Sequence, residues 1–204
     1  MNRTIIYCIS ITLLAISLIS CAPMHSKYFQ PTSDGKHSPK GCGGGPNKKI
    51  TIQLSDGVAV KAYSEITDKE KLQVIIEFEI RKNNSIKLAS NEFKLITKNA
   101  NKILFSQNLK IKSIVNPQPT PGSRRIIQAQ TEELIGNSYT RKFLWIEIQH
   151  HRTYYIFLDK YDLQENIIEF SLNIPSITIN GRPTKIPMLD FKKESGIHLY
   201  AFNC

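Results

Sequence analysis

The sequence has no segment of ten or more residues in which apolar side chains recur at the three- and four-residue spacing of an amphipathic helix, so long helices are not expected. Acidic residues are scarce, 17 against 27 lysines and arginines, which gives a formal charge of +10 at pH 7. The 204 residues are 41% hydrophobic and 22% charged, with a single long apolar run. This balance excludes a disordered polyelectrolyte and a multi-pass membrane protein, and the length fits one globular domain.

Signatures of catalysis and of cofactor binding are also missing. No Gly-x-Ser-x-Gly nucleophile elbow is present. The glycine-rich segment 41–49 is superficially similar to a phosphate-binding loop, but Pro46 interrupts it and a strand, not a helix, is expected after it. The carboxylates expected on solvated strand faces or in turns are Glu77, Glu79, Glu132 and Glu133. The sequence therefore predicts no catalytic residue, no cofactor and no enzyme activity, although carboxylates distant in sequence can still meet in space.

The histidines and the basic residues show no ligand-binding pattern. His150 and His151 are neighbours, and neighbouring side chains on a strand point to opposite faces, so one metal ion cannot readily use both. They are expected in an exposed loop, 149–152, between two strands, and no metal site is predicted. The basic residues are scattered without stacking aromatics, which argues against nucleic acid. They indicate a solvated basic surface or a weak attraction to anionic lipid or cell-wall polymer.

The N-terminus has the parts of an export signal. Arg3 is followed by an apolar run from Ile5 to Ile19, which is shorter than the ~20 residues of a membrane-spanning helix. Residues 1–20 are therefore predicted to be a cleaved signal peptide. Its last residues and the one that follows, Leu18-Ile19-Ser20-Cys21, resemble the lipobox of bacterial lipoproteins.

The lipobox resemblance implies a location. The thiol of Cys21 is expected to carry a diacylglycerol and its amine a further acyl chain, and two or more chains anchor a protein stably to a lipid bilayer. Ala22, where lipoproteins retained in the inner membrane have Asp, implies the outer membrane, facing the periplasm. The alternative is an ordinary secretory peptide cleaved nearby, which leaves Cys21 free.

Cys42 and Cys204 are the two cysteines that remain besides Cys8 in the signal peptide and Cys21. In an oxidising compartment such a pair favours a disulfide, which closes a loop of about 160 residues and contributes at most ~5 kcal/mol. The alternatives are two unpaired thiols, or a nucleophilic Cys42 paired with His198. No helix is expected after Cys42 to activate it.

Residues 21–47 are rich in proline and glycine and have only three large apolar side chains, so they are predicted to form a flexible tether. From 48 to 204, apolar and polar residues alternate in short runs typical of strands. Helical turns are expected only near 65–71 and 131–136. The strands are expected at 50–54, 58–62, 73–80, 93–98, 102–112, 125–131, 142–149, 153–159, 168–174, 176–180 and 197–202. The predicted fold is an all-β, two-sheet immunoglobulin-like β-sandwich, with a barrel as the alternative.

Two of the expected strands, 142–149 and 153–159, are apolar on both faces. If Leu144, Ile146 and Ile148 fill the core, other aromatic side chains are left for the opposite face. These candidate partner-binding residues are Phe143, Trp145, Tyr155 and Phe157. Either another part of the chain covers them, or they form an exposed patch suited to a partner, since tryptophan and tyrosine are enriched in binding hot spots.

The combined features indicate a non-catalytic, membrane-anchored binding or assembly module that resembles the small envelope lipoproteins of Gram-negative bacteria. Its expected partners are the lipid bilayer, through the acyl chains on Cys21, and another envelope protein, with no nucleic acid. The alternative function is a cell-wall glycan-binding domain or hydrolase with aromatic side chains as sugar platforms.

Overall fold

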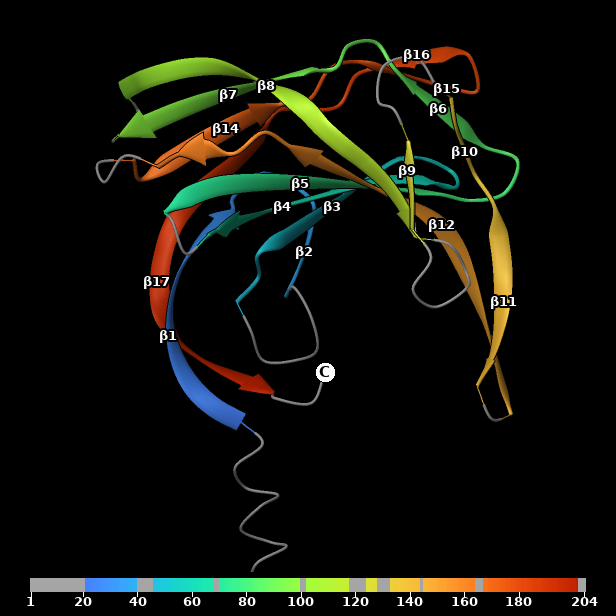
Figure 1. Ribbon diagram of the computed structural model, residues 1–204, viewed down its shortest axis with the longest axis horizontal. Helices are drawn as coiled ribbons and strands as arrows, with labels where there is room; N and C mark the ends of the chain where they lie inside the picture. The colour runs from blue at the N-terminus through green and yellow to red at the C-terminus, as the bar shows by residue number, and fades with distance from the viewer. Residues whose placement is uncertain are drawn as a thin grey trace, which may run out of the picture.

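The computed structural model describes residues 21–39, 46–67, 70–99, 102–117, 124–127, 133–143, 145–163 and 167–201. The regular structure in these segments is entirely β-strand, and the strands form two antiparallel sheets (Figure 1). The predicted all-β fold with two sheets is thus confirmed. Its narrower description as immunoglobulin-like is not confirmed.

The larger sheet has 13 strands and the smaller sheet four. Along the larger sheet the spatial order is β1 (Cys21–Pro31), β17 (Leu189–Ala201), β14 (Glu169–Asn173), β7 (Glu92–Asn99), β8 (Lys102–Pro117), β12 (Ile146–Leu158), β5 (Lys71–Ile80), β4 (Val58–Ile66), β3 (Lys49–Ser55) and β2 (Lys36–Ser38). Three further strands pair beside this path, namely β9 (Arg124–Ile127), β11 (Ser138–Phe143) and β13 (Tyr161–Asp162). The smaller sheet consists of β10 (Leu134–Ile135), β6 (Ser85–Leu88), β15 (Ile177–Ile179) and β16 (Arg182–Thr184).

The long strand β8 folds the larger sheet into two layers. Its first part, from Lys102 to Lys110, pairs with β7, and its second part pairs with β12 and β9. The layer containing β7 and β14 therefore lies over the layer containing β5 and β4 (Figure 1). Side chains from both layers, among them Ile76 of β5 and Phe170 of β14, share one hydrophobic core.

The N-terminal strand corrects the predicted tether and the predicted domain boundary at residue 48. Residues 21–31 form β1, which pairs with β17 along its whole length. The side chain of Phe29 has an exposed fraction of 0%, and its ring packs edge-on against Phe170 at a centroid distance of 5.0 Å. The segment folds because an antiparallel strand needs only a few buried side chains once its backbone groups are paired. Phe29 points into the hydrophobic core, and Tyr28, on the opposite face, packs edge-on against the His198 ring.

Several predicted sites fall on residues outside the described part of the chain. These are the signal peptide 1–20, the segment 40–45 with Cys42, and Cys204. The disulfide between Cys42 and Cys204 therefore stays a prediction, as does the lipid on Cys21, whose backbone begins β1.

Local sequence signals locate most strands and two hairpins correctly. The β3–β4 hairpin turns at Gly57, with φ of 83°. Asn180 and Gly181 have φ of 50° and 78° between β15 and β16, as a type I′ turn requires. The two expected helical turns lie partly outside the described residues. Where the chain is described it forms strand instead, because β4 continues to Ile66 and Leu134 belongs to β10.

The expected loop at 149–152 is also wrong. β12 is one continuous strand of 13 residues that includes His150 and His151. These polar residues interrupt the apolar alternation because the strand leaves the sheet at this point. From Ile146 to His151, β12 pairs with β11 and not with β5.

Candidate partner-binding hairpin

The hairpin formed by β11 and β12 extends beyond the larger sheet (Figure 1). β12 pairs with β5 only from Arg152 to Phe157, whereas from Ile146 to His151 its partner is β11. In the described part of the chain, β11 has no strand on its outer side. β11 and the Ile146–His151 part of β12 therefore form a two-stranded ribbon. Its stability depends on how it is attached, because an isolated hairpin is only marginally stable in water.

Hydrogen bonds at the root of the ribbon attach it to the sheet. The Gly136 N–H donates to the Asn84 carbonyl at 2.7 Å, and the Tyr154 hydroxyl donates to the Ile135 carbonyl at 2.8 Å. Gly136 lies so close to β5 that a Cβ atom there would be 2.0 Å from the Arg81 carbonyl oxygen. The root is thus fixed, and only glycine permits the approach.

The tip of the ribbon carries the most exposed large hydrophobic side chain of the described residues. Trp145 lies between the end of β11 and the start of β12, and 93% of its surface is exposed. Burying so large an apolar side chain is favourable by about 1.5–3 kcal/mol, which this fold leaves unused.

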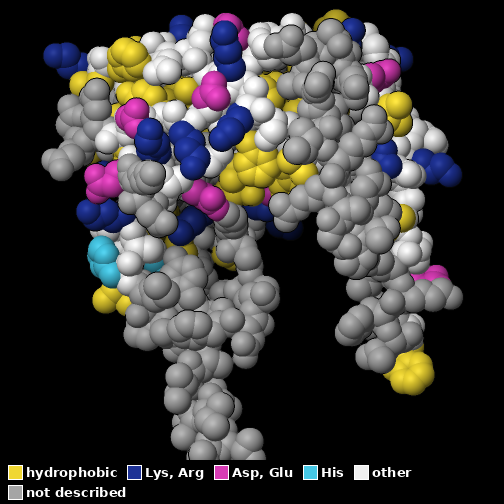
Figure 2. Space-filling view, viewed as in Figure 1, with side chains coloured by type: hydrophobic (Ala, Val, Ile, Leu, Met, Phe, Trp, Pro, Cys, Tyr) yellow, Lys and Arg dark blue, Asp and Glu magenta, His cyan; other side chains and the backbone are white. Residues whose placement is uncertain are grey.

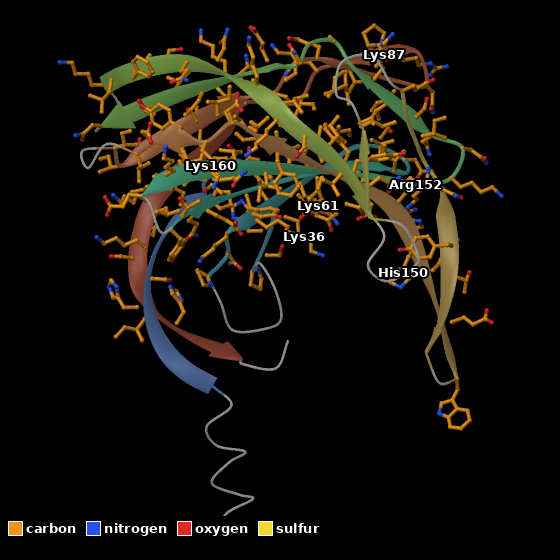
Figure 3. All side chains as sticks on the ribbon, viewed as in Figure 1. Lys36, Lys61, Lys87, His150, Arg152 and Lys160 are labelled. Carbon is orange, nitrogen blue, oxygen red and sulfur yellow. The ribbon has the colours of Figure 1, made fainter. Side chains whose placement is uncertain are left out.

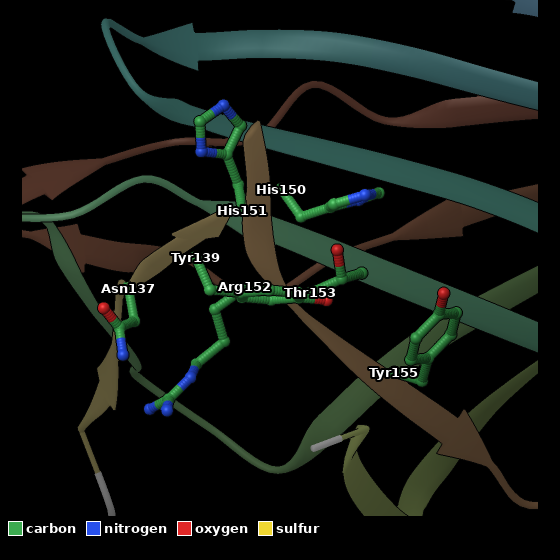
Figure 4. A pocket seen from close by; sticks show the side chains of 7 residues that line it. All are labelled: Asn137, Tyr139, His150, His151, Arg152, Thr153 and Tyr155. Carbon is green, nitrogen blue, oxygen red and sulfur yellow. The ribbon is translucent and has the colours of Figure 1, made fainter. Parts of the chain in front are cut away.

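A small polar cavity of about 220 Å³ lies at the root of the ribbon (Figure 4). Both histidines in it already contact β11: the His150 ring stacks on Tyr139 at 5.4 Å, and His151 Nδ1 lies 3.1 Å from the Ser138 hydroxyl. The cavity is smaller than the ~300 Å³ lower limit of typical ligand pockets. Its lining residues are Asn137, Tyr139, His150, His151, Arg152, Thr153 and Tyr155.

Three of the four predicted patch residues, Trp145, Tyr155 and Phe157, have described side chains, and these three do not form one surface. In the part of β12 that lies in the sheet, Tyr154 and Ile156 face the core, and Tyr155 and Phe157 face the other side half-buried, as the alternation predicts. Trp145 is ten residues from Tyr155 along an extended chain, a separation of about 30 Å. The Phe143 side chain lies outside the described part. The prediction failed because it placed both strands in the sheet.

A buried ion pair on the same sheet face was not expected from the sequence. Glu77 of β5 lies in register between Lys61 of β4 and Tyr155 of β12, and only 4% of its surface is exposed. Its carboxylate accepts a hydrogen bond from Lys49 Nζ at 2.9 Å, and that ammonium also lies 5.1 Å from the centre of the Tyr63 ring. The expectation of a solvated Glu77 is therefore wrong, because its neighbours on both adjacent strands cover it.

The residues around Glu77 are electrostatically coupled. Burial and the negative charge of Glu77 raise the pKa of both Tyr63 and Tyr155 above 10.0. Burial alone would raise the pKa of Glu79, but the hydrogen bond and the charge of Lys61, 2.6 Å away, lower it overall. Lys61 and Lys36 lie on the same face (Figure 3), where basic and acidic side chains are interspersed (Figure 2). The negative charge of the buried Glu77 carboxylate is balanced by the ammonium of Lys49.

Tyr63→Phe is expected to change how stability responds to alkaline pH. A raised pKa means that the folded chain keeps the phenol proton after the unfolded chain loses it, so this contribution is complete below about pH 10 and is lost as the pH rises further. Near pH 7 the variant should be about 1 kcal/mol less stable, because it lacks the hydroxyl that bonds Glu77. Urea unfolding from about pH 8 to 11 should show this deficit shrinking as the pH rises. A constant deficit would contradict the coupling.

Neither a metal centre nor a membrane-spanning helix is found within the described ranges. No three His, Cys, Asp or Glu side chains there come together where they could hold a metal ion. No helix there is long and apolar enough to cross a bilayer. Comparison with protein families, with curated proteins and with solved structures gives no match.

Proposed function

We propose that this chain is a membrane-anchored lipoprotein of the bacterial envelope that binds another envelope protein, without catalysis, through the β11–β12 ribbon. The lipobox-like residues Leu18–Cys21 support the lipid anchor, and Ala22 supports the outer membrane, facing the periplasm. The observation that carries the proposal is the ribbon's unpaired backbone. Within the described part of the chain, β11 pairs only with β12, and the Ile146–His151 part of β12 pairs only with β11.

Unpaired strand edges favour a protein partner. They present rows of free N–H and C=O groups with which a second chain can pair. A partner that adds a strand along β11 gains main-chain hydrogen bonds, with side chains on alternate positions for specificity. The neighbouring cavity gives less support to the alternative of glycan binding or hydrolysis, because it is small and His150 covers one face of the Tyr139 ring.

Site-specific photo-crosslinking in intact cells of the native producer tests this proposal. A photoreactive side chain at Thr140, exposed on β11, should capture one dominant envelope protein, identified by mass spectrometry. The same group at Lys87, exposed on β6 of the smaller sheet and at the end of the molecule opposite the ribbon tip in Figure 3, is the matched control and should capture none. Identical products from both positions, or none from Thr140, would contradict binding through the ribbon.

A further inference from the structure

The tip of the ribbon has the composition of a membrane-contacting loop. Phe143-Leu144-Trp145-Ile146 is a run of four large apolar residues, preceded by Arg141 and Lys142. Tryptophan is enriched where protein meets the headgroup region of a bilayer, and basic side chains are attracted to anionic lipid. Trp145, whose side chain is 93% exposed at the projecting tip, gains nothing from the protein core.

The direction of the ribbon agrees with that composition. The tip of the β11–β12 hairpin and the Cys21 end of β1 both project from the same side of the molecule, the lower side in Figure 1. Figure 2 shows a hydrophobic side chain at the lower end of the projection on the right. A bilayer that holds the Cys21 lipid therefore lies on the side toward which the tip points.

The two projections also have similar lengths. On β1, Cys21 lies seven residues before Tyr28, the first side chain of that strand described as buried, a distance of about 23 Å in an extended chain. On β12, the ribbon extends from His151 to Ile146, about 17 Å, and Trp145 lies beyond it. Because β1 is paired with β17 from Cys21 onward, no flexible tether separates the anchor from the domain.

From these observations we propose that the tip inserts Trp145 into the interface of the same bilayer that holds the lipid on Cys21. The tip is then a second membrane contact that fixes the orientation of the domain. This inference rests on the proposed lipid anchor. In this orientation the edges of the ribbon lie between the main part of the domain and the membrane, where a membrane-embedded partner reaches them.

The single tryptophan makes the inference directly measurable. The full lipidated protein is reconstituted into vesicles of phosphatidylethanolamine and phosphatidylglycerol, with ordinary or with brominated acyl chains. Because Trp145 is the only tryptophan, its fluorescence reports the tip alone. We expect a blue-shifted emission of Trp145 and quenching of that emission by the brominated chains. We also expect acrylamide, a quencher dissolved in the water, to quench Trp145 about tenfold less than it does in the unfolded chain in detergent-free solution.

A second variant separates the tip from the rest of the protein. Trp145→Phe combined with Phe105→Trp moves the reporter to β8, where residue 105 is part-exposed on the half of the strand that pairs with β7. This reporter should show no quenching by brominated lipid. Equal quenching of both reporters would overturn the inference, because it would indicate nonspecific adsorption.

The failure of the inference and the failure of the lipid anchor give different results. Vesicle flotation without quenching of Trp145 would overturn tip insertion and leave the anchor standing. A Cys21 peptide without acyl chains, by mass spectrometry, would overturn the anchor whatever the fluorescence shows. Failure to float would overturn both.

Discussion

Phe29→Ala should lower the free energy of unfolding by about 3–5 kcal/mol, the usual cost of removing a buried phenylalanine. Phe29 is fully buried, and its loss leaves a cavity against Phe170, which itself stacks on Phe191 at 4.6 Å. Surrounding side chains cannot readily fill that cavity, because Phe170 and Phe191 are held by strands β14 and β17. Urea unfolding followed by circular dichroism measures the loss.

A control in the same strand makes this experiment decisive. Lys27 of β1 is exposed, and Lys27→Ala should change stability by no more than about 0.5 kcal/mol. If Phe29→Ala were equally neutral, residues 21–31 would not belong to the folded domain, and the tether suggested by composition would be right. The outcome also bears on membrane orientation, because a packed β1 holds the domain directly at its anchor.

Lys49→Met should destabilise the fold by about 3 kcal/mol, the lower end of the range for breaking a buried ion pair. The substitution leaves the Glu77 carboxylate buried without its charge partner 2.9 Å away. The lower end applies because the Lys49 side chain is still about one-fifth exposed. Adding Glu77→Gln should restore most of the loss, because an uncharged amide still accepts the Tyr63 hydrogen bond.

A surface ion pair of equal length gives the matched control. Lys71 Nζ and Asp162 Oδ1 are also 2.9 Å apart, but Asp162 is largely exposed. Lys71→Met should therefore cost less than about 1 kcal/mol. Equal losses of stability for Lys49→Met and Lys71→Met would show that the burial of Glu77 adds nothing to the strength of its ion pair. If adding Glu77→Gln did not restore stability, the loss would come from the packing of the Lys49 side-chain stem.

Local patterns in the sequence determined the fold class and most of the strands. Ile76, Phe78 and Ile80 alternate with Glu77 and Glu79 and are all buried, because the period-two geometry of a strand places alternate side chains on one face. The Asn180–Gly181 turn was equally accessible from sequence, because its backbone needs two residues that tolerate positive φ. Such features depend on residues close together in the chain.

Only the tertiary structure decided the features that depend on distant partners. β1 folds because β17, some 170 residues later, pairs with it, and composition alone gives no sign of that partner. Glu77 is buried because Lys49 and Tyr63 from two other strands converge on it. β12 is one strand because β11 replaces β5 as its partner at His151, and the change of partner turns an expected surface patch into a projecting ribbon with Trp145 at its tip. In each case the free energy comes from contacts between segments far apart in the chain, which no local pattern encodes.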